Sequence, residues 1–503
     1  MFFPMSESET SSHAGAIRPA ARFAARHWWQ LLLISLAVLI PCYWHQRLEA
    51  GDLGSHTYNA WLAQLIERGQ VSGLAIVRLH QNVLFDLLLS GIAKFLPLLA
   101  AEKIAVSVVV LIFFWGAFAL AAAASRRAPW MVIPFLAMFA WGWTLEIGFL
   151  NYYFSLGISF WGLAIFWRGT TLERLWIFAL APLALLAQGA GALWMLGGAA
   201  YIWASERFPL RRQIWLLLAG AGAIFALRLW LYHRYIADPP SLPLYEFSGA
   251  DQLVLFGSRY WWPAVIFLAL LLTSLIAGWI ETHQDANYWK RFALAAQLLV
   301  LVQAGVWLLP DGIHFPQFTA AYSLITPRLT MLSAILLCCL LAAVPPRAWR
   351  VAAFVALAGC YFAMLYRDTG IVNGMEAQAE RLIESLPPNQ RVLATIEPPE
   401  GSHLVVHHIV DRACIDRCFS YGNYEPPSDA FRIRVLRPNP YVMSNVSSTA
   451  AMEEGSYRVQ PSDLPAYQIY QCGGWTTLCI RPLAAGQENN ETGAEPQKPT
   501  PAL

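Results

Sequence analysis

The chain has 503 residues, of which 57% are hydrophobic and only 13% are charged, and its formal net charge is +2. This composition excludes a string of ordinary soluble domains, and the scattered single basic residues exclude a nucleic-acid-binding patch. Runs of about 20 apolar residues recur along most of the chain, and each is long enough to cross a bilayer. The sequence therefore predicts an all-α polytopic membrane bundle with about 11 transmembrane helices.

Residues 1–26 are rich in Ser, Ala and Arg without an apolar pattern, so they are predicted to form a disordered cytoplasmic tail. The first apolar run extends from Trp28 to His45. Because no small-residue cleavage site follows Cys42, this run is predicted to be a retained helix rather than a signal peptide. A transmembrane domain is accordingly predicted over residues 27–366.

Residues 46–100 form a long predicted outer loop that begins with a combination of polar and aromatic residues. A helix here would place four polar residues on one face, at positions i, i+3, i+4 and i+7: Asp52, Ser55, His56 and Asn59. An aromatic and apolar stripe repeats the same spacing beside this face, which is typical of a helix lying along a membrane surface. The alternative is that Asp52 merely caps this helix, since Asp is a favoured N-cap residue.

The next apolar stretch, Leu79–Ser90, is interrupted by Asp86 and is predicted to be an interfacial or re-entrant helix rather than a span. Ten further spans are predicted after it. In chain order they are Glu102–Ala124, Trp130–Phe149, Tyr152–Trp167, Leu175–Gln188, Ala190–Ala204, Ile214–Tyr235, Trp261–Ile280, Phe292–Leu309, Leu329–Val344 and Val351–Tyr366.

The distribution of basic residues predicts the orientation of these spans. With a cytoplasmic N-terminus, every short loop on the inner side holds at least two basic residues, as the positive-inside rule requires. Merging the two short spans around Gln188 would give ten spans and would move Arg207, Arg211 and Arg212 to the outer side. Eleven spans are therefore favoured, and an odd number places the C-terminal part outside.

The chain becomes more polar after Tyr366, and residues 367–485 are predicted to form a small extracytoplasmic α+β domain. A short amphipathic helix is expected at Glu376–Leu386. Alternating patterns predict strands at Arg391–Ile396, Ser402–His407, Phe431–Val435 and Tyr467–Tyr470. The Gln-, Asn-, Glu- and Pro-rich residues 486–503 are predicted to be disordered.

Four of the eight cysteines lie in this polar C-terminal part: Cys414, Cys418, Cys472 and Cys479. Four cysteines in one small domain facing an oxidising compartment predict two disulfides. Zinc is the alternative, but Cys-x3-Cys with Cys-x6-Cys matches the usual short ligand pairs poorly. Local pairing, Cys414 with Cys418 and Cys472 with Cys479, is expected because each pair is close in sequence, although spacing leaves crossed pairing open.

The unusual polar residues of the membrane part gather at its predicted outer edge. They are Asp52, His56, Asn59, His80, Glu146, Asn151, Tyr152, His314 and Arg328. An ionisable group near or inside a bilayer is costly, so each such group is a candidate for function. The alternatives are that Glu146 is an acid reaching to the interface and that Arg328 is an ordinary interfacial anchor.

These features carry a resemblance to a known class. An N-terminal span, a long outer loop that opens with an acid in Gly-Asp52-Leu-Gly-Ser-His, and a second acid in Leu-Glu146-Ile-Gly-Phe-Leu-Asn resemble the GT-C class of membrane glycosyltransferases. The resemblance implies an enzyme of the bacterial cytoplasmic (inner) membrane that uses a polyprenyl-phosphate-linked sugar and works among membrane lipids. It also implies that Asp52 is a catalytic base or the ligand of a divalent cation, and that Glu146 is the second catalytic acid.

Such a reaction makes chemical sense for these residue types. A carboxylate such as Asp52 takes the proton of an acceptor hydroxyl, and Arg328 has the character needed to hold the departing phosphate. The remaining candidates are expected to bind substrate: His56, Asn59, His80, Asn151, Tyr152 and His314.

A non-catalytic membrane protein, either a transporter or a scaffold that displays the outer domain, is the rival prediction. A transporter of the usual repeat type would show matching helix breaks in its two halves. Gln188–Gly191 is one such break, but it has no counterpart later in the chain. A scaffold would tolerate the loss of Asp52.

Overall fold

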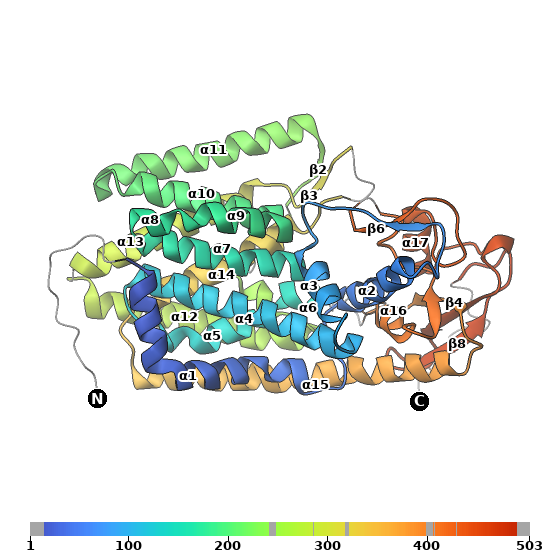
Figure 1. Cartoon of the computed structure of the whole chain (residues 1–503). Helices are drawn as coiled ribbons and strands as arrows, with labels where there is room; N and C mark the ends of the chain where they lie inside the picture. Colours follow the sequence, from blue (N-terminus) through green and yellow to red (C-terminus); the bar gives the residue numbers. More distant parts are fainter. Residues whose placement is uncertain are drawn as a thin grey trace, which may run out of the picture.

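The computed structural model describes residues 15–240, 248–284, 286–316, 321–398, 406, 408–428 and 430–489. Most of the longer helices lie alongside one another in an elongated bundle, and the strand-rich C-terminal residues gather at one end of it (Figure 1). The α-helices up to α15 are α1 (Ile17–Tyr43), α2 (Leu53–Glu67), α3 (Leu84–Ile92), α4 (Leu98–Ser125), α5 (Ile133–Ala140), α6 (Trp143–Glu146), α7 (Leu150–Arg168), α8 (Thr171–Arg174), α9 (Trp176–Ala187), α10 (Gly189–Ser205), α11 (Gln213–Arg234), α12 (Trp261–Thr282), α13 (Ala286–Leu308), α14 (Ile325–Ala342) and α15 (Ala348–Glu384).

Six helical segments in the described part of the chain are long and apolar enough to cross a membrane. They are α1, α4, α14, α15 and the segments Leu210–Arg234 and Ser258–Thr282, which contain α11 and α12. Two shorter apolar segments, Trp130–Glu146 and Phe292–Leu308, accompany them. A mostly helical, multi-pass membrane protein is thus confirmed, whereas the count of eleven spans stays a prediction.

Two helices extend beyond their predicted bounds. The helix α1 begins at Ile17, inside the tail predicted to be disordered, because its alanine-rich start is a strong helix former; residues 1–14 of that tail lie outside the described residues. The helix α15 runs without interruption for 37 residues, about 55 Å at 1.5 Å per residue. It therefore passes through the predicted domain boundary at residue 366 and includes most of the short helix expected at Glu376–Leu386.

The third predicted span, Trp130–Phe149, is not one continuous helix. It consists of a 3-10 turn (Trp130–Val132), then α5 and α6, with a break at Trp141 and Gly142. Gly142 is extended, and the indole of Trp141 donates a hydrogen bond of 2.8 Å to the carbonyl of Val38. The break separates α5 from the short helix α6, which ends at Glu146.

The C-terminal residues form a four-stranded sheet with the order β5-β4-β7-β8. The strands of the chain are β1 (Leu74–Ile76), β2 (Ile236–Asp238), β3 (Gly312–His314), β4 (Gln390–Thr395), β5 (Cys418–Ser420), β6 (Ile433–Val435), β7 (Ala466–Gln471) and β8 (Leu478–Pro482), and two short helices, α16 (Ile409–Ala413) and α17 (Val446–Glu453), lie among them. Strand β4 is parallel to β5 and β7, and β8 is antiparallel to β7.

Most of the predicted C-terminal strands are present. Arg391–Ile396 corresponds to β4, Tyr467–Tyr470 falls in β7 and Phe431–Val435 contains β6, whereas Ser402–His407 falls largely outside the described residues. Of the tail predicted over 486–503, residues 490–503 are also outside them, and Glu488 forms a bridge with Arg458.

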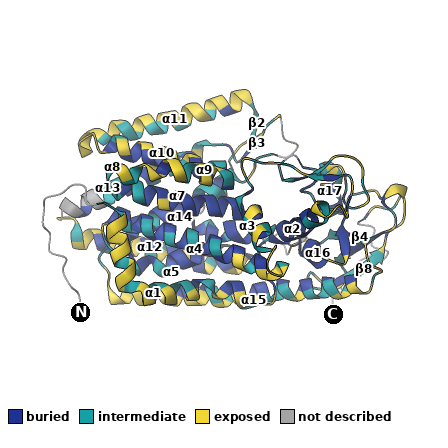
Figure 2. Ribbon diagram, in the orientation of Figure 1, coloured by how far each residue is buried: buried dark blue, intermediate teal, exposed yellow. Residues whose placement is uncertain are grey.

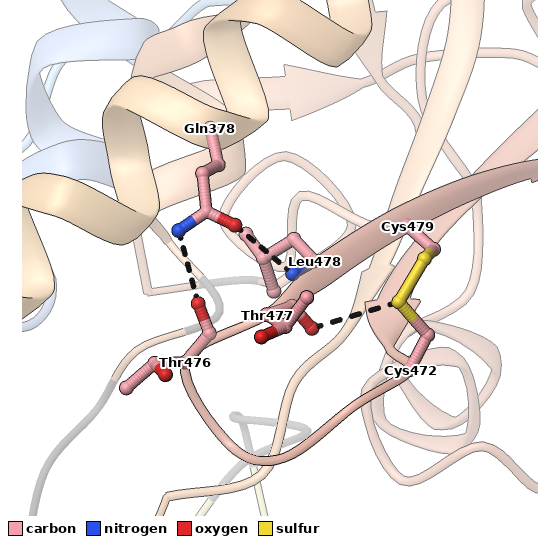
Figure 3. The surroundings of a disulfide bond; sticks show 6 residues. All are labelled: Gln378, Cys472, Thr476, Thr477, Leu478 and Cys479. Atoms are coloured by element: carbon pink, nitrogen blue, oxygen red, sulfur yellow. Dashed lines mark hydrogen bonds between the residues drawn. A yellow bond between two sulfur atoms is a disulfide. The ribbon is translucent and has the colours of Figure 1, made fainter.

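Both predicted disulfides are present. The sulfur atoms are 2.05 Å apart in Cys414–Cys418 and 1.94 Å apart in Cys472–Cys479. The second disulfide closes the turn before β8, and Gln378 of α15 holds this turn: its Nε2 donates to the carbonyl of Thr476 and its Oε1 accepts from the amide of Leu478 (Figure 3). The local pairing is thus confirmed, and the long helix is fastened directly to the sheet.

Candidate functional site

The site is built around α2, which is buried at the junction between the helical bundle and the C-terminal residues. Eleven successive residues, Leu53–Ala63, are buried, and Figure 2 shows this helix in dark blue whereas α11 is largely exposed. The predicted helix is present, but it does not lie on an open surface. C-terminal residues cover its polar face, and β6 pairs with β1, the strand that follows α2 in the chain.

A first set of contacts joins this helix to the bundle. The Nδ1 atom of His56 is 2.8 Å from an Asp86 oxygen, and the other oxygen of Asp86 accepts a hydrogen bond of 3.1 Å from Asn151. The Oδ1 atom of Asn151 also accepts from the amide of Phe85, at 2.8 Å. Two predicted substrate-binding residues, His56 and Asn151, are therefore brought together through an acid that was expected only to interrupt an apolar stretch.

A second set of contacts joins the helix to the C-terminal residues. Ser55 donates a hydrogen bond of 3.0 Å to Glu425, and Asn423 donates one of 2.9 Å to Asn59. His56 also lies 3.8 Å from Glu425. The polar face predicted from the spacing is therefore real, and it is engaged by partners more than 360 positions away in the chain.

Asp52 occupies the N-cap position of α2, but its side chain makes no capping hydrogen bond. Instead, one carboxylate oxygen lies 3.5 Å from Nε2 of His408, and the Asp52 side chain keeps 21% of its surface exposed. The Nδ1 atom of His408 is 2.8 Å from Asp411, and its ring lies 5.2 Å from that of Tyr424. A histidine held by one acid thus faces another, the arrangement in which a third group orients an acid–base pair.

The turn that follows Glu146 touches Asp52 through the backbone. The amide of Asp52 donates to the carbonyl of Ile147 at 3.2 Å, and a Cβ placed on Gly148 would lie 2.7 Å from the Cβ of Asp52. Gly148 has φ +95°, so both the space and the backbone angle require glycine here. Glu146 itself is 4% exposed, and its carboxylate has no hydrogen bond or ion pair with another described residue.

Arg328 lies at the start of α14, surrounded by aromatic rings. Its guanidinium carbon is 4.2 Å from the ring centre of Phe149, 4.6 Å from that of Tyr322 and 5.5 Å from that of Tyr152. Nη1 donates to the hydroxyl of Tyr322, and the hydroxyl of Tyr152 donates to the carbonyl of Arg328. No carboxylate of the described residues pairs with this guanidinium, and its buried Nε has no hydrogen-bond partner.

Two of the predicted site residues, His80 and His314, take no part in the contacts described above. His80 is exposed in the loop before α3. His314 is in β3, where its half-exposed side chain lies 3.4 Å from Asp238 of the paired strand β2. Both lie in segments that were predicted to be outer, but such a position does not decide which way a side chain points.

Several contributors at the junction were not predicted from the sequence. They are Asp86, His408, Asp411, Asn423 and Glu425. The i, i+3 spacing of His408 and Asp411 on one helical turn is a signal that could have marked that pair. Nothing in the sequence around Asn423 and Glu425 marks them as partners of α2.

The charges at the junction depend on burial and on close neighbours. Burial lowers the pKa of His56, but the charge and hydrogen bond of Asp86 outweigh it and raise the pKa to about 9. For His408, burial is likewise outweighed by the hydrogen bond and charge of Asp411, and the pKa is also about 9. Burial raises the pKa of Glu425 to about 7 against the opposing charge of His56. Both histidines are therefore protonated at neutral pH.

These shifts predict how stability depends on pH. A histidine whose folded-state pKa is raised stabilises the fold fully below about pH 6.5, and this contribution is lost as the pH rises through about 9. The melting temperature of the purified protein in detergent should therefore fall between pH 7 and pH 9.5. The raised pKa of Glu425 has the same effect at lower pH: its contribution to the stability of the fold is lost as the pH rises from about 4.5 through about 7. In the double variant His56→Gln, His408→Gln the fall above pH 7 should be much smaller; an unchanged slope would mean that other groups cause it.

The fold and the junction define the class: a multi-pass membrane protein with a disulfide-containing C-terminal α+β region docked on the buried helix α2. Comparison of the chain with protein-family models, with curated proteins and with solved structures gave no match. The described residues contain no group of three or more His, Cys, Asp or Glu placed to hold a metal ion. The functional conclusion therefore depends on the geometry of the junction.

Proposed function

We propose that the protein is an integral membrane glycosyltransferase-like enzyme that moves a sugar from a polyprenyl-phosphate-linked donor to an extracytoplasmic acceptor. The observation that best supports this proposal is the environment of the Asp52 carboxylate. Its carboxylate sits at a helix N-cap without capping it, remains partly exposed and faces the protonated His408 at 3.5 Å. The cap alternative predicts a capping hydrogen bond, which Asp52 does not make. A positioned carboxylate of this kind is suited to act as a general base.

In the proposed reaction Asp52 removes the proton of an acceptor hydroxyl as its oxygen bonds to the anomeric carbon of the sugar. The bond from that carbon to the phosphate oxygen breaks, and the electron pair leaves with the polyprenyl phosphate. Arg328 offers the departing phosphate a cation that no described carboxylate neutralises. His408 faces Asp52 as a positive charge, and Glu146 is a second acid, adjacent to the Ile147 carbonyl that binds the Asp52 amide.

The described residues around Asp52 do not form a donor set for a divalent cation. Its neighbour His408 is bonded through Nδ1 to Asp411 and is protonated at neutral pH, whereas a histidine must be neutral to bind a metal. The proposal therefore assigns no step to a metal.

The proposed topology has eleven spans in a bacterial inner membrane, with a cytoplasmic N-terminus and an extracytoplasmic C-terminal region. The start of α1 and the end of α15 lie at opposite ends of the bundle, which supports an odd number of crossings (Figure 1). The disulfides support an oxidising compartment for the C-terminal region.

The proposal is tested with the full chain in nanodiscs and a panel of radiolabelled polyprenyl-phosphate sugars. Wild type should bind one donor, and Arg328→Gln should weaken this binding about tenfold or more, since a charge-assisted hydrogen bond contributes about 1.5–3 kcal/mol. Arg228→Gln is a matched control, because Arg228 also lies over a tyrosine ring, 4.9 Å from that of Tyr232, but on the peripheral helix α11. Absence of binding to every donor, or equal binding by Arg328→Gln, would support the scaffold alternative.

A further inference from the structure

The helix α1 has two parts that run in different directions. His27 has non-helical backbone angles, φ −114° and ψ 19°, and divides the helix into an arm, Ile17–Arg26, and a span, Trp28–Tyr43. Figure 1 shows the arm lying across the end of the bundle farthest from the C-terminal strands, transverse to the rest of α1. The arm therefore does not continue the span into solvent.

Defined contacts hold the arm in this position. The carboxylate of Glu173 accepts hydrogen bonds of 2.8 Å from the amides of Ala16 and Ile17, which fixes the start of the arm. Phe23 packs against Trp130 and Phe118, with ring centres 5.5 and 6.4 Å apart. One face of the arm is thus docked on the bundle.

The arginines of the arm lie on a different face of the helix from Phe23, and their side chains have no partner among the described residues. Arg18, Arg22 and Arg26 are spaced four residues apart, so they form one row along the helix, and all three are exposed. None of them forms an ion pair or hydrogen bond with another described residue. Two other arginines at this end of the bundle, by contrast, are engaged: Arg168 donates to the carbonyl of Ala123, and Arg174 pairs with Glu206.

The residues that follow the arm indicate its depth in the membrane. Trp28 and Trp29, at the start of the span, are 64% and 51% exposed. Exposed tryptophans at the end of a span are typical of the bilayer interface, where the headgroups lie. A transverse helix directly before them lies at headgroup level, with its row of arginines available to lipid phosphates.

We propose that the arm, Ile17–Arg26, is an in-plane anchor that binds the anionic headgroups of phospholipids in the adjacent leaflet. A bilayer surface supplies anionic phosphates at the depth and along the direction of the row. A basic residue near an anionic membrane contributes about 1 kcal/mol, so each arginine should raise binding about fivefold. The inference is independent of the proposed enzymatic activity.

The test is native mass spectrometry of the full chain titrated with phosphatidylglycerol or phosphatidylcholine. The variant Arg18→Gln, Arg22→Gln, Arg26→Gln should bind phosphatidylglycerol at least about tenfold more weakly than wild type, with unchanged binding of phosphatidylcholine. The corresponding triple lysine variant should bind like wild type, because the attraction is to charge. Arg68→Gln, Arg437→Gln, Arg458→Gln removes three exposed arginines near or within the C-terminal region and is the charge-matched control.

Equal losses in the arm variant and the control would overturn the proposal, because they would show a general effect of net charge. Unchanged binding in the arm variant would overturn it too. If the arm variant does not fold, the salt dependence of phosphatidylglycerol binding by the wild-type protein tests the proposal by itself. Raising ammonium acetate from 0.05 to 0.5 M should release most of the bound phosphatidylglycerol, and salt-independent retention would contradict the proposal.

Discussion

Asp52→Asn is expected to lower sugar transfer at least about 100-fold, because a positioned general base contributes about 10²–10⁴ in rate. The substitution removes a proton acceptor and keeps the shape of the side chain. The fold should be unchanged, since Asp52 holds the neighbouring turn through its backbone amide, which the variant retains. Transfer of radiolabelled sugar by purified protein in nanodiscs measures the first effect, and the melting temperature measures the second.

Two further variants make this test specific. Glu67→Gln removes an exposed carboxylate from the other end of the same helix and should leave transfer within about twofold of wild type. His408→Gln should reduce transfer less than Asp52→Asn, because it removes a neighbouring charge and not the proton acceptor. If His408→Gln is the more severe of the two, the histidine and not Asp52 is the base. If Asp52→Asn retains full activity, the assignment of Asp52 is wrong.

The polar face of α2 could be predicted from sequence because helical spacing is a local property. Asp52, Ser55, His56 and Asn59 all take part in contacts of the junction. Their partners could not be predicted in the same way. Which of the many polar residues of the C-terminal part would cover this face depends on how β4 and β5 pair and where α16 docks, and no local pattern encodes either.

The C-terminal end of α15 is a second feature that could not be predicted from the sequence. Hydropathy falls after Tyr366, and this fall indicated the end of a span and the start of a new domain. Hydropathy reports the surroundings of a helix, whereas helix ends are set by breakers and caps. No proline occurs between Ala348 and Glu384, so the helix continues out of the bundle and carries Gln378 to the C-terminal sheet. The disulfides were predicted correctly because each closes a short local loop.

Arg412 is the centre of a buried ionic cluster that joins the C-terminal residues to the bundle. Its guanidinium lies 2.9 Å from Glu102 of α4, 2.5 Å from Glu376 of α15 and 3.4 Å from Glu49, and it donates to the carbonyl of Leu48 at 2.8 Å. The side chain is only 3% exposed. Burial raises the pKa of Glu49 to about 8 despite this partner, so removing the arginine would leave carboxyl groups that the surroundings cannot solvate.

Arg412→Met is therefore expected to destabilise the protein by about 3–5 kcal/mol, the usual cost of removing one partner from a buried ion pair. The matched control is Arg417→Met, five positions further along: its side chain is 59% exposed, its contact with Glu384 is 3.6 Å long, and its loss should cost below about 1 kcal/mol. Thermal and denaturant unfolding in detergent, followed by tryptophan fluorescence, compare the two. Adding Glu376→Gln to Arg412→Met should recover part of the loss, because it removes one of the unpaired buried charges. Equal stabilities of Arg412→Met and Arg417→Met would show that the cluster does not hold the C-terminal region on the bundle.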